Sequence, residues 1–253
     1  MSNLAISSPE WYLKAKDASS DIGRLTIFHL GFKQATSGTL IFPPLDFSTH
    51  PRAILDVGTA DGLWMRDVQS SLPSPPHSTH TFIGTDINES FFPSTTSPGI
   101  QYIKQDVRDP PPPDWYGSFD LINMRMILIA AGSSAAQRAA VVEHIALLKP
   151  GGWIQIGDCD RVCPTNVTEN PSYHDMFVCI RAVCQKSGAD PLEAPKMKGW
   201  LEEAGLEEVQ EMTAMRAVGK RNEDGELGRK SVEADMIIAK GFVEAAKGEC
   251  MGD

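Results

Sequence analysis

Short apolar runs alternate with amphipathic segments through the middle of this 253-residue chain. Five of the runs are rich in Ile, Val, Leu and Phe and are bounded by turn residues, which predicts short buried strands. Helical periodicity follows the first strand and precedes the fifth, whereas the two connections between them are rich in Pro, Gly and Ser. This strand–helix alternation is typical of an α/β fold with a mostly parallel sheet. The predicted strands are "RAILDV", "HTFIGTDI", "IQYIKQDV", "FDLINMRM" and "WIQIGDCD", beginning at residues 52, 80, 100, 119 and 153.

The rest of the pattern predicts helices and one further strand. The segment "LEEVQEMTAM" at 206–215 is predicted to be a sixth strand, and a seventh is not evident, so we expect six or seven strands. If the seventh is absent, an exposed sheet edge remains, which a partner or a second copy of the chain could cover as a homodimer. The expected helical segments are 23–36, 62–72, 133–152 with a Ser cap and a Pro-Gly-Gly end, much of 161–195, 196–205 and 225–247.

Composition and charge narrow the function classes. The chain is 42% hydrophobic and 22% charged and carries a net charge of −10. An acidic balance without a cluster of Lys and Arg argues against a nucleic-acid-binding protein. No apolar run approaches the ~20 residues that a membrane span needs, and the N-terminus lacks the basic and apolar regions of a secretory signal. We therefore expect a cytoplasmic protein with a small-molecule substrate and with neither nucleic-acid nor membrane partners.

The five cysteines predict free thiols, because their number is odd and no secretory signal accompanies them. Cys159 and Cys163, followed by Cys179 and Cys184 with His174 between the pairs, superficially resemble a zinc site. Their spacing is loose and the second pair lies in helical sequence, so no metal site is expected.

The chemistry begins with a turn between the first strand and the next helix. In "AILDVGTADGLWMRDV", Gly58 and Gly62 allow a ligand to approach the backbone closely, and the helix that follows offers its N-terminal amides. No Gly-Lys-Ser/Thr follows, so the turn is not a P-loop. Ala60 and Asp61 break the dinucleotide-binding spacing, and an aspartate would repel a pyrophosphate.

Two further carboxylates stand at the ends of the next strands. Asp86 ends the second strand, where an acid can accept hydrogen bonds from ribose hydroxyls. Asp106 ends the third strand, where its side chain and the next amide can meet an adenine edge. The carboxyl ends of parallel strands form the ligand-binding edge of such sheets. A site that takes adenosine and avoids phosphate indicates S-adenosylmethionine, although turn-capping alone would explain any one of these acids.

Four segments, in order and at matching spacing, resemble the class I S-adenosylmethionine-dependent methyltransferases: "ILDVGTADGLW", "FIGTDI", "IKQDVRDPPPPDWYGSFDLINMRMI" and "LLKPGGWIQIGD". "RLTIFH", "GSFDLINMR" and "LKPGGWIQI" are similar, more narrowly, to the fungal subgroup related to the LaeA-type regulator of secondary metabolism, which includes natural-product methyltransferases. The resemblance covers about residues 11–230. It implies a Rossmann-like domain at 51–253 with a helical cap insertion at about 161–195, and an N-terminal helical lid at 1–50.

The resemblance also implies a set of cofactor-binding residues. The turn would surround the methionine half of the cofactor, the second and third strands would hold ribose and adenine, and residues after the fourth strand would line the methionine moiety. An N-terminal segment with Tyr12 and His29 would cover the site. The implied cofactor-binding residues are Tyr12, Asp56, Gly58, Ala60, Gly62, Asp86, Ile87, Asp106, Val107, Asn123, Met124 and Arg125.

One departure from the subgroup concerns the turn itself. Ala60 and Asp61 stand where the subgroup commonly has Gly-Thr. A carboxylate at this place would either lie beside the cofactor or face solvent.

The expected reaction is methyl transfer to an oxygen or nitrogen atom of a small natural product. His29 and His174 are the candidate catalytic bases, with a core or boundary role as the alternative for His29. Tyr173, Trp153 and Met126 are candidates to line the acceptor pocket, with packing as their alternative. Two other functions stay open: a regulator of the same fold that acts through partners, and an enzyme of the same fold that catalyses a cyclisation or rearrangement.

Overall fold

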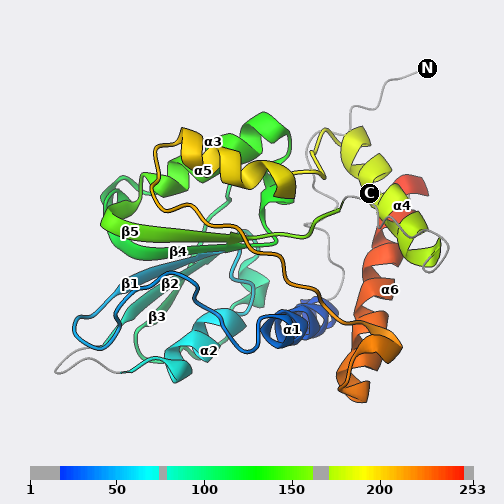
Figure 1. Cartoon of the computed structure of the whole chain (residues 1–253), viewed down its shortest axis with the longest axis horizontal. Helices are drawn as coiled ribbons and strands as arrows, with labels where there is room; N and C mark the ends of the chain where they lie inside the picture. The colour runs from blue at the N-terminus through cyan, green and yellow to red at the C-terminus, as the bar shows by residue number, and fades with distance from the viewer. Residues whose placement is uncertain (1–17, 74–78, 162–170, 248–253) are drawn as a thin grey trace.

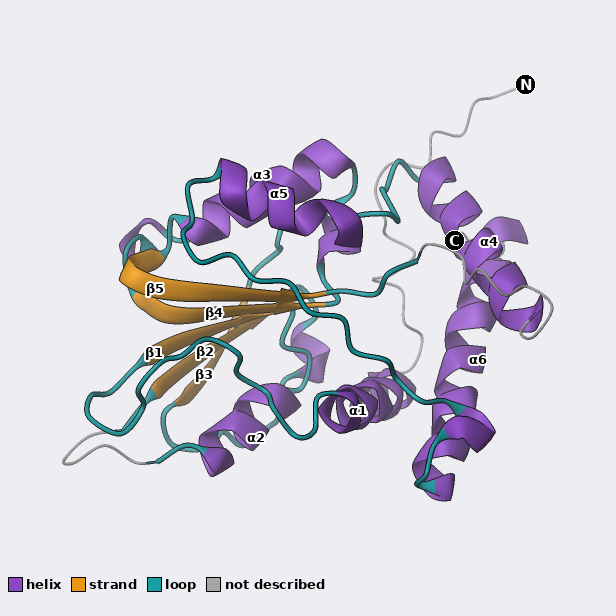
Figure 2. Ribbon diagram, viewed as in Figure 1, coloured by secondary structure: helices purple, strands orange, loops and turns teal. Residues whose placement is uncertain are grey.

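A five-stranded, all-parallel sheet forms the centre of the protein (Figures 1 and 2). The computed structural model describes residues 18–73, 79–161 and 171–247. The strand order is β3-β2-β1-β4-β5. The chain adds β2 and β3 on one side of β1 and then crosses over to add β4 and β5 on the other side. The strands are β1 Ala53–Val57, β2 Thr81–Asp86, β3 Ile100–Lys104, β4 Phe119–Arg125 and β5 Leu148–Gly157. The predicted Rossmann-like α/β fold is therefore confirmed.

Helices cover both faces of the sheet and its carboxyl end. Figure 2 shows α3 and α5 on one face, α2 and α1 on the other, and α4 and α6 beyond the carboxyl ends of the strands. None of the described helices is long and apolar enough to cross a membrane. The helices are α1 Ala18–Ala35, α2 Leu63–Ser71, α3 Ser134–Ile145, α4 Pro171–Lys186, α5 Met197–Glu203 and α6 Gly225–Lys247.

Both faces of the central strands are buried, because successive side chains of a strand point to opposite faces. Leu55 and Ile122 pack in the cluster that includes Trp200 of α5. Ile54 and Leu121, the preceding residues, pack in the cluster that includes Trp64 of α2. Burial on two sides explains why the strands appear in the sequence as continuous apolar runs rather than as alternating patterns.

The prediction of a sixth strand at 206–215 is wrong, and over the described residues the sheet has five strands rather than six or seven. Residues 206–218 contain no strand, and β5 is an edge of the sheet in the part of the chain that is described. In Figure 1 this segment runs from α5 across the molecule to α6. Met212 and Met215 are 60% and 83% exposed. The segment therefore has no buried apolar face that strand pairing would require.

The end of α3 also differs from the expectation. The helix ends at Ile145 and β5 begins at Leu148, before the Pro-Gly-Gly sequence that was expected to end the helix. These three residues lie inside β5, where Gly151 has a φ of 76° and the pairing with β4 shifts register. The positive φ is one that glycine adopts without a steric penalty. Pro-Gly-Gly therefore forms an irregularity of the strand.

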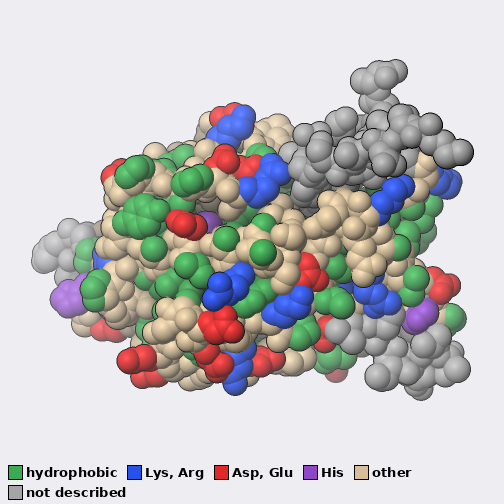
Figure 3. Space-filling view, turned by 90° about the horizontal axis from the view of Figure 1, so that it is seen from above, with side chains coloured by type: hydrophobic (Ala, Val, Ile, Leu, Met, Phe, Trp, Pro, Cys, Tyr) green, Lys and Arg blue, Asp and Glu red, His purple; other side chains and the backbone are tan. Residues whose placement is uncertain are grey.

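Acidic and basic side chains are interspersed over the face of the molecule in Figure 3. The net charge of −10 is thus not gathered into one patch on that face.

A carboxylate at the start of β4 joins three strands at the amino end of the sheet. Asp120 accepts hydrogen bonds from the Ala53 backbone nitrogen at 2.9 Å, from Arg52 at 3.0 Å and from Lys149 at 2.6 Å. Burial alone would raise the pKa of Asp120, but these donors outweigh it and the pKa lies below its ordinary value. The ionised carboxylate therefore stabilises the fold.

We expect Asp120→Ala to lower the free energy of unfolding by about 2–3 kcal/mol at pH 7, because it removes charge-assisted hydrogen bonds from a mostly buried site. The difference from wild type should shrink as the pH falls through the lowered pKa of Asp120, since the carboxylate then becomes protonated in the folded state. Urea unfolding at several pH values measures both effects. Asp114→Ala, at an exposed position, is the control. Equal stability of the two variants would contradict this account.

Candidate functional site

A cavity of about 830 Å³ lies at the carboxyl end of the strands. Its walls come from the turns after β1, β2 and β3 and from helices α1, α4 and α6. This is the edge where open parallel sheets bind ligands, next to the point where the strand order reverses. The volume is within the range of cofactor and small-molecule pockets.

The glycine turn after β1 forms one wall and is bonded to the end of β2. Gly58 and Thr59 donate backbone hydrogen bonds to Thr85, each at 2.8 Å. The Ala60 backbone nitrogen donates to Asp86 Oδ2 at 2.9 Å. The φ angles of Gly58, Ala60 and Gly62 are all positive, at 73°, 51° and 75°. A left-handed alanine is a strained conformation that the surroundings must hold in place, and such strain clusters at ligand sites.

Side chains at the two glycines would collide with neighbouring residues. A Cβ atom on Gly62 would lie 2.1 Å from the Tyr102 hydroxyl, and one on Gly58 would lie 2.8 Å from Ile127. The positive φ angles would strain any L side chain there as well. Packing and backbone conformation therefore both require glycine at the two positions, but only Gly58 lines the cavity and Gly62 does not.

Asp61, the unusual residue of the turn, is paired with a cation. Its Oδ2 lies 2.7 Å from Arg66, and its Oδ1 accepts from the Leu63 backbone nitrogen at 3.2 Å. Arg66 also donates to the Asp61 backbone oxygen. The carboxylate that departs from the subgroup's pattern thus has its charge compensated within the turn and the first residues of α2.

Asp56, at the end of β1, is a buried carboxyl group that joins the turn to β4. It accepts from the Thr59 hydroxyl at 2.6 Å and from Asn123 Nδ2 at 2.7 Å. Burial raises the pKa of Asp56 to about 6, against the opposing effect of these donors and of Arg125. Gln155 of β5 donates to Asn123 at 2.8 Å and extends the chain of hydrogen bonds to a third strand.

Four predicted residues line the cavity after β2 and β3: Asp86, Ile87, Asp106 and Val107. Asp86 accepts from the Ala60 and Asn88 backbone nitrogens, each at 2.9 Å, and burial raises its pKa. Asp106 is bonded to the Arg108 guanidinium, which holds the pKa of Asp106 below its ordinary value despite partial burial. Carboxylate oxygens are therefore present where the sequence predicts ribose and adenine contacts.

Asn123 and Met124 do not line the cavity, although the resemblance implies contact with the cofactor. Both are buried, with exposed fractions of 3% and 0%. Arg125, the next residue, does line it. Arg125 is the last residue of β4, and the cavity lies beyond the carboxyl ends of the strands, so the residues before it do not reach the cavity. Asn123 instead supports the site from behind through Asp56.

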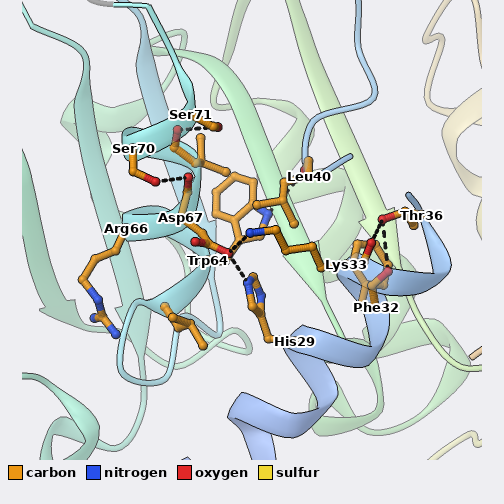
Figure 4. Close-up of polar contacts among 12 residues, drawn as sticks. His29, Phe32, Lys33, Thr36, Leu40, Trp64, Arg66, Asp67, Ser70 and Ser71 are labelled. Carbon is orange, nitrogen blue, oxygen red and sulfur yellow. Dashed lines mark hydrogen bonds and ion pairs between the residues drawn. The ribbon is translucent and has the colours of Figure 1, made fainter. Parts of the chain in front are cut away.

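His29 reaches the cavity wall, and both of its ring nitrogens have partners. Figure 4 shows the contact with Asp67. Nε2 lies 2.9 Å from Asp67 of α2, and Nδ1 lies 3.1 Å from Arg125 Nη2. An arginine can only donate, so Nδ1 accepts and the proton resides on Nε2. Burial lowers the pKa of His29, which favours this neutral form. Lys33, also on α1, binds the same Asp67 oxygen at 2.8 Å.

The other predicted residues lie away from the cavity or outside the described part of the chain. His174 is partly exposed, contacts Asp175 at 3.3 Å and does not line the cavity. Trp153 packs in the core beside Trp64 rather than at the cavity, whereas Met126 lines it. Tyr12 lies outside the described residues.

The far wall contains a polar cluster of which the sequence analysis identified only Tyr173. The Tyr173 hydroxyl donates to Asp235 Oδ2, and Arg216 donates to Asp235 Oδ1 at 2.6 Å. Arg216 also lies over the ring of Phe28, 4.5 Å from its centre. All four residues line the cavity. They come from α1, α4, α6 and the irregular segment before α6, so no local pattern in the sequence brings them together.

Comparison with known proteins identifies relatives of the whole domain. N-methyltransferase gliN of Aspergillus fumigatus is 32% identical over 212 residues, covering 83% of this chain and 73% of the relative. Methyltransferase psoC of the same fungus is 34% identical over 199 residues, covering 78% and 70%. N-methyltransferase sirN of Leptosphaeria maculans is 34% identical over 196 residues, covering 77% of this chain and 66% of the relative. The chain thus spans about two thirds to three quarters of their length. No protein-family model matches it.

A solved structure with the same fold is a chain of the Haloferax volcanii complex between the Trm112 methyltransferase activator and a methyltransferase. It superimposes with a TM-score of 0.54 at 15% identity, covering 91% of this chain and 94% of the other. At this identity the likeness concerns the fold alone.

The raised pKa of Asp56 predicts a pH-dependent stability. The folded state holds the proton up to about pH 6, whereas an unfolded aspartate releases it near its ordinary value of 3.8. The contribution of Asp56 to stability is therefore complete below that value and is lost as the pH rises to about 7, by up to about 3 kcal/mol. We expect the stability of wild type relative to Asp56→Asn to fall over this range in urea unfolding. A difference that does not change with pH would contradict the prediction.

Proposed function

Because this chain belongs to the S-adenosylmethionine-dependent methyltransferases of class I that include gliN and psoC, we propose that it methylates a nitrogen atom of a small natural product. Two of the reported relatives, gliN and sirN, are named N-methyltransferases, which supports nitrogen over oxygen as the acceptor atom. The observation that carries the proposal is the cavity, where the turn after β1 converges with Asp56, Asp86 and Asp106 at the carboxyl ends of the strands.

The cavity fits the adenosine half of the cofactor at its β2–β3 side. Asp86 would hold the ribose hydroxyls, since an ionised carboxylate has about four acceptor sites and the backbone donors Ala60, Asn88 and Ile87 do not fill them all. Ile87 would pack against the adenine, and Asp106 with the backbone of Val107 would contact its edge. No phosphate would have to approach these acids.

The methionine half would lie along the glycine turn. Gly58, Thr59 and Ala60 of this turn line the cavity. Arg125 at the end of β4 presents a cation with a buried nitrogen that has no partner among the described residues. A zwitterionic amino-acid group would place its carboxylate against this cation.

When bound, the cofactor supplies a methyl group that is already activated on sulfur. The protein then has to align the acceptor and exclude water, which in well-oriented systems is worth up to ~7–11 kcal/mol. Helices α1, α4 and α6 enclose the cavity and suit both tasks. Their apolar lining includes Phe28, Met176 and Phe177.

The acceptor would lie against the cluster of Tyr173, Asp235 and Arg216. The Tyr173 hydroxyl donates its hydrogen to Asp235, so its remaining lone pairs can accept a hydrogen bond from an N–H group of the acceptor. As that nitrogen is methylated, its proton can pass to Tyr173 Oη while Tyr173 passes its own to Asp235. His29 is less suited to act as the base, because its only lone pair is already occupied by Arg125.

The cofactor site is tested by titration calorimetry with S-adenosylhomocysteine. We expect micromolar binding by wild type and a loss of at least about 30-fold in Asp86→Ala, since two charge-assisted hydrogen bonds to the ribose would be lost. Asp109→Ala, an exposed aspartate after β3, serves as the control and should bind as wild type does. Absence of binding to wild type would contradict the proposed function.

The acceptor site is tested by transfer of a radiolabelled methyl group from S-adenosylmethionine to a panel of small aromatic amines and amides. Tyr173→Phe should slow transfer by about 10- to 100-fold, because it removes a group that accepts a proton, and it should leave S-adenosylhomocysteine binding unchanged. Equal rates in wild type and Tyr173→Phe would refute the role of this cluster. Conversion of an acceptor without S-adenosylhomocysteine formation would indicate a rearrangement enzyme instead.

A further inference from the structure

Five arginines line the cavity, and they differ in how their charge is compensated. Four of them form an ion pair with an acidic side chain among the described residues, and Arg125 forms none there. The four pairs are Arg24 with Asp21, Arg108 with Asp106, Arg161 with Asp158 and Glu193, and Arg216 with Asp235.

Arg125 is half-buried, so the missing anionic partner has an energetic cost. Its Nη1 is buried without a hydrogen-bond partner among the described residues, and its Nη2 donates only to a neutral histidine. The guanidinium lies over the ring of Phe32, 5.1 Å from its centre. The nearest acid, Asp56, has its oxygens bonded to Thr59 and Asn123. A buried cation without an anion in contact is unfavourable, and an anionic ligand would relieve the cost.

We propose that Arg125 binds the carboxylate of the amino-acid end of the cofactor and that His29 and Asp67 hold its guanidinium in place for that contact. This inference rests on the proposed function, because it assigns a ligand group within the same cavity. A carboxylate is the group that a planar guanidinium binds best, through two parallel hydrogen bonds. The other four arginines each contact a carboxylate of the protein, which compensates their charge. This holds also for Arg216, although its Nη1 is buried without a hydrogen-bond partner among the described residues.

His29 is in this account a positioning residue. Its Nδ1 accepts from Arg125 only while the ring is neutral with the proton on Nε2. Asp67 fixes that tautomer by accepting from Nε2, and Lys33 holds Asp67 from the other side. The contacts therefore run from α2 through α1 to the end of β4. A change in Asp67 should reach the ligand only through the orientation of Arg125.

The experiment compares two ligands that share the adenosine and thioether groups. S-adenosylhomocysteine carries the amino-acid carboxylate, and 5′-methylthioadenosine lacks the whole amino-acid end. We expect Arg125→Gln to weaken S-adenosylhomocysteine about 10- to 100-fold and to change methylthioadenosine by less than about threefold, as measured by calorimetry. Arg24→Gln is the matched control, because it removes an arginine of the same cavity that is already paired. It should leave the preference between the two ligands as in wild type.

Asp67 supplies the test of the positioning role. Asp67→Ala should reduce the preference for S-adenosylhomocysteine, whereas Asp67→Asn, whose amide oxygen can still accept from His29 Nε2, should retain most of it. Methylthioadenosine binding reports in every variant that the pocket is folded. If Arg125→Gln binds neither ligand, Arg125→Lys replaces it and should keep methylthioadenosine binding while weakening S-adenosylhomocysteine.

The outcomes separate the two proposals. If wild type binds neither ligand, the proposed function fails. If wild type binds both ligands and Arg125→Gln and Arg125→Lys weaken them equally or not at all, the carboxylate assignment fails while the cofactor site stands. A selective loss in Arg24→Gln instead would also overturn the assignment to Arg125.

Discussion

The buried carboxyl group of Asp56 is the constraint on which the site depends. It lies where β1 and β4 run side by side, and its two oxygens are bonded to the glycine turn through Thr59 and to β4 through Asn123. The turn therefore cannot move independently of the strands, and the strained φ of Ala60 is held by a rigid surrounding. Burying an acid is unfavourable, as the raised pKa of Asp56 shows. The unfavourable burial of Asp56 thus occurs where the carboxyl group fixes the glycine turn to the strands.

The cavity also depends on the packing of helices that are distant from one another in the sequence. Helix α1 is held against α2 and β4 by His29 and Lys33, and it packs beside α6, which in turn packs beside α4. These helices complete a cavity that the sheet alone leaves open. The carboxyl edge of the sheet supplies acids and the turn after β1, whereas the helices supply aromatic rings and the cluster around Asp235. We therefore propose that the two walls serve the two ligands of a methyl transfer.

The sequence predicts what is local and misses what depends on tertiary contacts. The five strands, the glycine turn and the acids of β1, β2 and β3 follow from short patterns with a physical cause, and the structure confirms their places in the fold. The prediction of a strand at 206–215 was wrong, because alternation of apolar and acidic residues also suits an exposed irregular chain. The partners of His29 and the meeting of Tyr173, Arg216 and Asp235 join residues separated by at least 19 positions, which no spacing rule captures. The roles of these residues toward ligands stay proposals.

A crystal structure of the protein grown with saturating S-adenosylhomocysteine tests the central claim most directly. The account predicts the adenosine between the ends of β2 and β3, with the ribose hydroxyls on Asp86 and the thioether beside the glycine turn. The ligand in that cavity should also exclude water from the side facing α1 and α6. A ligand bound elsewhere on the molecule, or a cavity that holds only water at that concentration, would contradict the account.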